Sequence, residues 1–176
     1  MTSALESLQR LREGNDRFRE SLSHGQSVAG VAKRLVLPQE QQPFAIVLGC
    51  SDARVPAEII FDQGLGDLFV IRVAGNIVAP SQVGSVEFAA SKFCCRLVVV
   101  LGHSQCGAIL ATLDELQQPS ENQSRGLRSI VDRVRPSVET WLESELGGDR
   151  EALVRHAVRA NVECSVNHLR HGSEIL

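Results

Sequence analysis

The chain has 176 residues, of which 43% are hydrophobic and 22% charged, values that are ordinary for a soluble globular protein of one domain. Its formal net charge is −3 and it contains no basic block, so the sequence does not indicate a nucleic-acid partner. No apolar run approaches the roughly 20 residues of a membrane span, and no secretory signal is visible at the start, so we expect a cytoplasmic protein without a membrane partner.

The first predicted element is an amphipathic helix. Ser3 and Glu6 have the spacing of a capping box, a pair of residues that satisfies the free backbone N–H groups at a helix start. Apolar residues follow at helical spacing at positions 5, 8, 11, 18 and 22. We expect this apolar face to pack on the protein's own core or on a partner subunit, and the pattern allows both.

The rest of the chain alternates between short apolar runs and helical patterns. Buried strands are predicted at 44–48, 68–74 and 96–101, and helices at 55–61, 84–93, 108–116, 127–146 (interrupted near Pro136) and 150–170, with a loop over 24–42. This alternation predicts an α/β protein with a mainly parallel β-sheet core flanked by helices. Because no strand follows the last helix, we expect C-terminal strands of the fold to be missing from the sequence.

The five cysteines do not resemble a disulfide framework, since their number is odd and two of them are adjacent. We interpret Cys94, Cys95 and Cys164 as packing residues because they lie inside or beside predicted helices. Cys50 and Cys106 lie in turns beside glycine, where packing explains them poorly. A metal-binding or catalytic role is therefore the better interpretation of these two thiols.

A candidate metal site follows from the ends of two predicted strands. Cys50 follows the first strand, and His103 and Cys106 follow the third. The carboxyl ends of parallel strands meet at one edge of a sheet, where ligand crevices form. Two thiolates and one imidazole suit Zn²⁺, and three protein ligands leave a fourth position for water, as in catalytic zinc sites. The alternative is a chance grouping of two buried thiols and a core histidine.

Two charged residues follow the first cysteine at alternate positions. Asp52 could occupy the fourth zinc position or accept a hydrogen bond from zinc-bound water, and Arg54 is its expected charge partner. The alternative is an ordinary salt bridge at a strand end. Zinc with a free position lowers the pKa of bound water to about 7, so these residues indicate hydration or hydrolysis of a small electrophile.

The sequence closely resembles the β-class carbonic anhydrases. The matching motifs are 50–56, 72–76 and 102–107, and residues 11–18 are similar to the family's N-terminal arm. The resemblance covers nearly the whole chain and implies a single domain over 1–176. It also implies a carbonate dehydratase, a zinc lyase that reversibly hydrates carbon dioxide to bicarbonate and a proton through a zinc-bound hydroxide.

The resemblance further assigns roles to individual residues. Cys50, His103 and Cys106 become the zinc ligands, and Asp52 with Arg54 the dyad that gates the fourth position, with Asp52 a possible fourth ligand in a closed state. The implied substrate-binding residues are Gln41, Phe69, Phe88 and Gly107. The family forms dimers or assemblies of dimers, so we expect a homodimer or homotetramer whose N-terminal helical arm packs on a partner subunit.

Other functions fit the same residues. Relatives on the same scaffold hydrolyse carbonyl sulfide or carbon disulfide with the same zinc ligands, and a zinc-binding but noncatalytic member is a second alternative. A redox or nucleotide-binding α/β domain is disfavoured, because the chain has neither a Cys-x-x-Cys motif nor a Gly-x-Gly-x-x-Gly motif after a strand.

Overall fold

The computed structural model of the chain describes residues 2–24, 39–120, 122–142 and 148–176. The backbone forms two compact units. The first comprises Met1–Leu48, Ala53–Ile71 and Gly84–Val99, and the second comprises Gly49–Asp52, Arg72–Val83 and Val100–Leu176. Within the described ranges, no helix combines the length and the apolarity needed to cross a bilayer.

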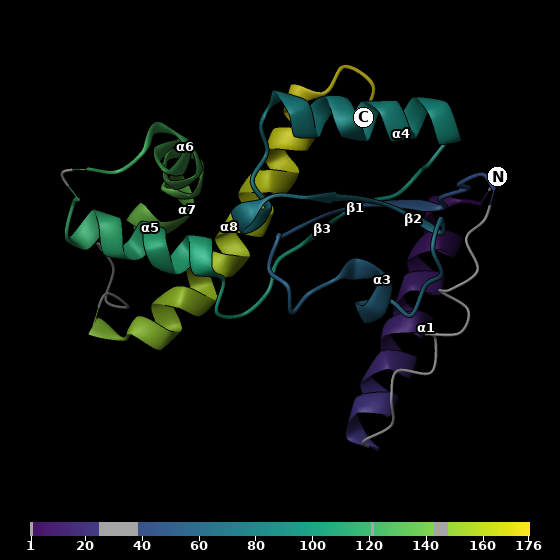
Figure 1. Ribbon diagram of the computed structural model, residues 1–176, viewed down its shortest axis with the longest axis horizontal. Coiled ribbons are helices and arrows are strands. Elements are labelled where there is room, and N and C mark those ends of the chain that lie inside the picture. Colours follow the sequence, from purple (N-terminus) through teal and green to yellow (C-terminus); the bar gives the residue numbers. More distant parts are fainter. Residues whose placement is uncertain (1, 25–38, 121, 143–147) are drawn as a thin grey trace. The chain divides into compact units, whose positions relative to one another are not determined.

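Three strands form one parallel sheet (Figure 1). They are β1 (Ala45–Gly49), β2 (Leu68–Arg72) and β3 (Val98–Leu101), and β1 lies between the other two. Every residue of β1 is buried, because a central parallel strand is covered on both faces and therefore consists of a continuous apolar run. The predicted α/β class with a parallel sheet flanked by helices is confirmed.

In the first unit, α1 (Ala4–Ser23) begins with the predicted capping box: the Glu6 carboxylate accepts from the Ser3 N–H at 2.7 Å and the Ser3 hydroxyl accepts from the Glu6 N–H at 3.2 Å. Its buried residues are Ser7, Leu11 and Gly14, and it packs on α3 (Ala57–Ile60). Gly14 allows this close packing, because an added Cβ would lie 1.8 Å from the Phe61 carbonyl oxygen.

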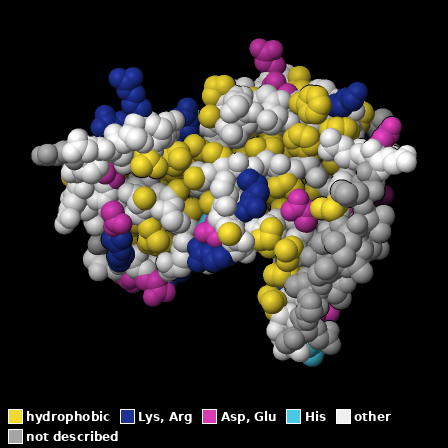
Figure 2. Space-filling model, in the orientation of Figure 1, with side chains coloured by type: hydrophobic (Ala, Val, Ile, Leu, Met, Phe, Trp, Pro, Cys, Tyr) yellow, Lys and Arg dark blue, Asp and Glu magenta, His cyan; other side chains and the backbone are white. Residues whose placement is uncertain are grey.

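The apolar face that the sequence predicts for α1 is only partly buried. Leu11 is buried, whereas Leu5 is 79% exposed and Leu22 is 60% exposed. Apolar side chains are accordingly visible along the surface that α1 forms (yellow in Figure 2). The helix buries the small residues Ser7 and Gly14 beside Leu11, so its inner face is rotated from the predicted one. Packing of this arm on a partner subunit stays a prediction.

The second unit is mainly helical. It contains the 3₁₀ turn η1 (Ala74–Asn76) and the helices α5 (Gly107–Gln117), α6 (Arg125–Val134), α7 (Pro136–Leu142) and α8 (Arg150–Gly172). Here α7 packs along α8, and η1 contacts both α5 and α8. Pro136 begins α7, which explains the predicted interruption. The turn η1 is thus held between two helices.

Several boundaries differ from the predicted ones. Helix α4 (Pro80–Phe93) begins four residues earlier than predicted, because proline is well suited to the first position of a helix. Strand β2 ends at Arg72, and the predicted strand residue Ala74 belongs to η1 instead. Most of the predicted loop at 24–42 and the end of the helix at 127–146 lie outside the described residues.

Candidate metal centre

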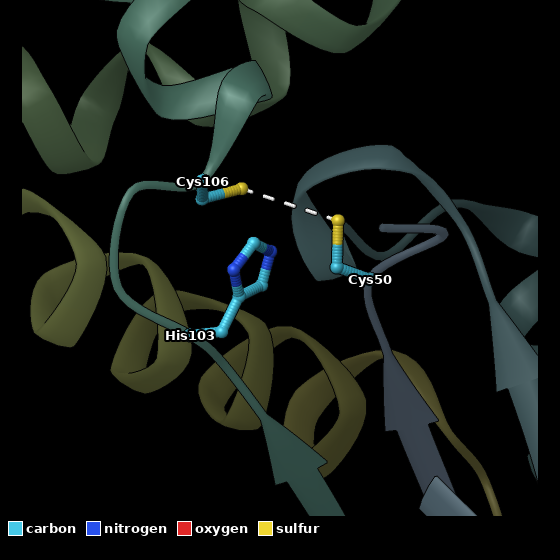
Figure 3. Close-up of side chains that lie close together, drawn as sticks. All are labelled: Cys50, His103 and Cys106. Atoms are coloured by element: carbon cyan, nitrogen blue, oxygen red, sulfur yellow. Dashed lines mark hydrogen bonds between the residues drawn. The ribbon is translucent and has the colours of Figure 1, made fainter. Parts of the chain in front are cut away.

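Three potential metal ligands converge in the second unit. Cys50 follows β1, His103 follows β3, and Cys106 is the N-cap residue of α5. Their ligand atoms all lie within 4.8 Å of one another, and the two sulfurs are 4.0 Å apart. Figure 3 shows the three side chains pointing toward one another. The structure therefore brings together the three residues that the sequence analysis selected.

The loop between β3 and α5 has the backbone shape that this convergence needs. Gly102 lies against α8 so closely that an added Cβ would be 2.6 Å from Cγ2 of Val162. Gln105 has a φ of 53°, a left-handed conformation that turns the chain back on itself. As a result, His103 and Cys106 project toward the same point from the loop 102–106.

The tautomer of His103 suits metal binding. Nδ1 lies 2.9 Å from the Ser104 carbonyl oxygen, so this nitrogen carries the proton and donates it to the carbonyl. Nε2 then has a free lone pair, and it is buried without a hydrogen-bond partner among the described residues. A buried acceptor without a partner costs about 1–3 kcal/mol, a penalty that coordination to a metal would remove. The imidazole therefore fits a metal ligand.

The two thiols form a coupled pair. The hydrogen bond from the Cys106 thiol lowers the pKa of Cys50 to about 4, and the backbone N–H of Gly75, 3.3 Å from the Cys50 sulfur, also lowers it. The same thiol–thiolate bond, together with burial, raises the pKa of Cys106 above its ordinary value. The thiol–thiolate bond therefore favours loss of the first proton of the pair from Cys50 and holds back loss of the second from Cys106.

This difference predicts how many protons the site releases when it binds metal. Adding Cd²⁺ to the metal-free protein near pH 7.5 should release about one proton, from Cys106, because Cys50 has already lost its own. The affinity should rise about tenfold for each unit of pH, since one proton leaves for each ion bound.

Calorimetric titrations in two buffers of different ionisation enthalpy measure this number. Cadmium is the better probe here, because its coordinated water is much less acidic than that of zinc and adds no proton of its own. Release of two protons would mean that both thiols are protonated in the metal-free protein. Release of none would mean that both are ionised, and either result contradicts the coupled pair.

A carboxylate and a guanidinium adjoin the three ligands. Oδ2 of Asp52 lies 3.9 Å from Nε2 of His103, and the Asp52 side chain is only 17% exposed. Arg72 donates from Nε to the Cys50 carbonyl at 3.0 Å and from Nη2 to the Asp52 carbonyl at 2.5 Å. Arg72 thus holds the backbone that presents both residues. Arg72 lies in the matching motif 72–76, but the resemblance assigned it no role.

The remaining candidates divide between the two units. Gly107 is the first residue of α5, and apart from its chain neighbours and its own helix backbone, no atom of the described residues lies within 4 Å of the position that a Cβ would take. Arg54, in the first unit, is exposed, and Gln41 lines a polar cavity of about 370 Å³ in the same unit. Phe69 and Phe88 pack with ring centroids 6.1 Å apart, and Phe88 is 54% exposed. The roles assigned to these residues stay predictions.

Fold and site together define a class of protein. A parallel α/β sheet whose strand ends carry two thiolates and one imidazole, with a carboxylate beside them, has the donor set of a zinc metalloprotein. The cluster fits zinc in particular, because zinc accepts both sulfur and nitrogen ligands.

Comparisons with known proteins identify the family. Residues 45–176 match the family model described as carbonic anhydrase. The chain is 47% identical to a carbonic anhydrase of Mycolicibacterium smegmatis over 130 residues, which is 73% of this chain and 61% of that protein. It is 44% identical to carbonic anhydrase 2 of Mycobacterium tuberculosis over 128 residues, again 73% and 61%.

Solved structures agree with this result. A tetrameric β-carbonic anhydrase of Sordaria macrospora matches with a TM-score of 0.66 and 25% identity, over 89% of this chain and 85% of that one. The chain belongs to the carbonic anhydrase family, and the solved structures that it resembles are of the β class. It spans about three fifths of the length of the two mycobacterial relatives, 61% of each.

Proposed function

We propose that the protein catalyses the reversible hydration of carbon dioxide to bicarbonate and a proton. The observation that carries this proposal is the convergence of Cys50, His103 and Cys106 within 4.8 Å, with the Asp52 carboxylate beside them, in a chain of the carbonic anhydrase family. One water and one carbon dioxide are consumed for each bicarbonate and proton formed, so no redox partner or further substrate is needed.

The three converging side chains would hold a zinc ion. Cys50 and Cys106 supply thiolate sulfur, and His103 supplies Nε2, which the hydrogen bond at Nδ1 leaves free. Zinc in such a site supplies Lewis acidity, which lowers the pKa of a coordinated water to about 7. Arg72 keeps the Cys50–Asp52 backbone in place through the two carbonyl groups that it binds.

Asp52 and Arg54 are proposed to control the reacting water. The Asp52 carboxylate, 3.9 Å from the imidazole, would accept a hydrogen bond from that water at Oδ2 and so orient its lone pair toward the carbon of the substrate. Arg54 would keep this carboxylate ionised and correctly turned. In a closed state Asp52 would instead occupy the fourth ligand position, and the protein would be inactive.

The substrate pocket and the assembly complete the proposal. Gly107 would offer its backbone N–H to the substrate, and Gln41, Phe69 and Phe88 would line the pocket, Gln41 from a neighbouring subunit. We propose that residues 1–176 act as one domain in a cytoplasmic homodimer or homotetramer. The exposed Leu5 and Leu22 on α1 support a partner for that helix, and light scattering measures the assembly directly.

The test is stopped-flow carbon dioxide hydration on protein of measured zinc content, from about pH 6.5 to about pH 9. Turnover should rise with pH through a single ionisation, because only the deprotonated water is a nucleophile. Loss of activity only at the low end of this pH range would fit capping of the metal by Asp52. No turnover at any pH with one zinc per chain would contradict the proposal, and rates on carbonyl sulfide would then separate a hydrolase from a noncatalytic member.

A further inference from the structure

Helix α8 carries two polar side chains in its buried face. Asn161 is 2% exposed and Ser165 is 3% exposed, and they lie one helical turn apart. Both bond to the turn η1: Nδ2 of Asn161 donates to the Gly75 carbonyl at 2.7 Å, and Oγ of Ser165 donates to the Asn76 carbonyl at 2.9 Å. Burying two polar groups is unfavourable unless they are paired, and these two are paired with one turn.

The turn that they hold has an uncommon backbone. Gly75 has φ 71° and ψ 17°, and Asn76 has a φ of 43°, so two consecutive residues are left-handed. Such a conformation persists only where the surroundings enforce it. An added Cβ on Gly75 would lie 2.9 Å from the Cβ of Ala108 at the start of α5. The turn is therefore enclosed by α5 and fastened to α8.

This turn also reaches the metal centre. The Gly75 N–H donates to the Cys50 sulfur at 3.3 Å. Gly75 therefore contacts the thiolate through its N–H and Asn161 through its carbonyl. Between the two polar residues, Val162 packs against Gly102, the residue before His103. Figure 3 shows α8 (yellow-olive) passing behind the loop that carries His103. One segment of α8 thus contacts both the turn that donates to the Cys50 sulfur and the residue before His103.

We propose that Asn161 and Ser165 are positioning residues of the metal centre, which keep the Gly75 N–H directed at the Cys50 sulfur and thereby set the strength of zinc binding. The proposal rests on the zinc ligands named under the proposed function. Hydrogen bonds from N–H groups stabilise a thiolate, and partners of this outer shell typically change metal affinity about 10- to 100-fold when they are removed.

The test measures zinc affinity by chelator competition and the sulfur-to-cobalt charge-transfer band of the Co²⁺ protein. Asn161→Ala should weaken zinc binding about 10- to 100-fold, and Ser165→Ala should weaken it in the same direction. Both should shift the charge-transfer band, because the charge on the Cys50 sulfur changes. Ser165→Thr keeps the hydroxyl and should restore the affinity and the band of the wild type.

Ser137→Ala is the matched control. Ser137 is also a buried helical serine of the second unit, 4% exposed, and its hydroxyl has no hydrogen-bond partner among the described residues. Its loss should leave affinity and spectrum unchanged. Folded Asn161→Ala or Ser165→Ala protein with wild-type affinity and an unshifted band would overturn the proposal. Wild-type protein that binds zinc without hydrating carbon dioxide would contradict the proposed function and leave the positioning role intact.

Discussion

Replacing Cys106 by serine should remove zinc and activity together. Cys106 is 1% exposed, and its sulfur lies 4.0 Å from that of Cys50. A serine hydroxyl keeps its proton near neutral pH and is a poor ligand beside a thiolate and an imidazole. Removing a hydrogen-bond partner of a ligand typically lowers metal affinity about 10- to 100-fold, and loss of the ligand itself should lower zinc affinity further. Zinc content by atomic emission and turnover by stopped flow measure both effects.

Cys94→Ser is the control for this variant. Cys94 is an exposed thiol of the first unit, outside the ligand cluster, so its replacement should leave one zinc per chain. Both variants carry a single cysteine-to-serine change and are prepared and loaded with metal in the same way, so their zinc contents can be compared directly. Retention of a full zinc ion by Cys106→Ser would show that Cys106 is not a ligand.

Asp52→Asn should keep zinc and lose most of the turnover. The three proposed ligands are unchanged, so zinc content should stay near one per chain. The amide has no negative charge to orient the reacting water, and loss of such a group typically lowers a rate about 10²- to 10⁴-fold. Stopped-flow rates are measured across the full pH range. Loss of a gating carboxylate lowers the rate at every pH, whereas a shifted ionisation only moves the pH profile.

Asp132→Asn provides the comparison for Asp52. Asp132 is an exposed carboxylate on α6 that pairs with Arg135 at 3.5 Å, so removing its charge should leave turnover unchanged. If Asp52→Asn has a rate near that of the wild type at every pH, the proposed role of this carboxylate is wrong. If it loses zinc as well, Asp52 contributes to metal binding more than the three-ligand assignment allows.

The fold class and the ligand cluster were predictable for local reasons. The run 44–48 has no polar residue, which marks a buried strand, and Cys50, two residues after it, is expected at the sheet edge. His103 and Cys106 follow a similar run within six residues. Glycine-flanked turns at two strand ends were therefore enough to bring the three ligands together.

The residues that support the site from other parts of the chain were not predictable from local sequence. Asn161 and Ser165 bond to carbonyls that are 86 and 89 residues away in the chain, and no local pattern records such a pairing. A helix prediction treats polar residues as part of the solvent-facing side, so burial of these two side chains was not expected. The rotated inner face of α1 has the same origin, because Ser7 and Gly14 are small enough to be buried without being hydrophobic.

The discontinuous make-up of the second unit has a consequence for biosynthesis. Its proposed metal ligands Cys50 and Cys106 are 56 residues apart in the chain, and α8, which fastens the intervening turn, is made after both of them. A growing chain on the ribosome therefore cannot present a complete site until nearly all of this sequence has emerged. Zinc capture should thus be a late event that follows docking of α8.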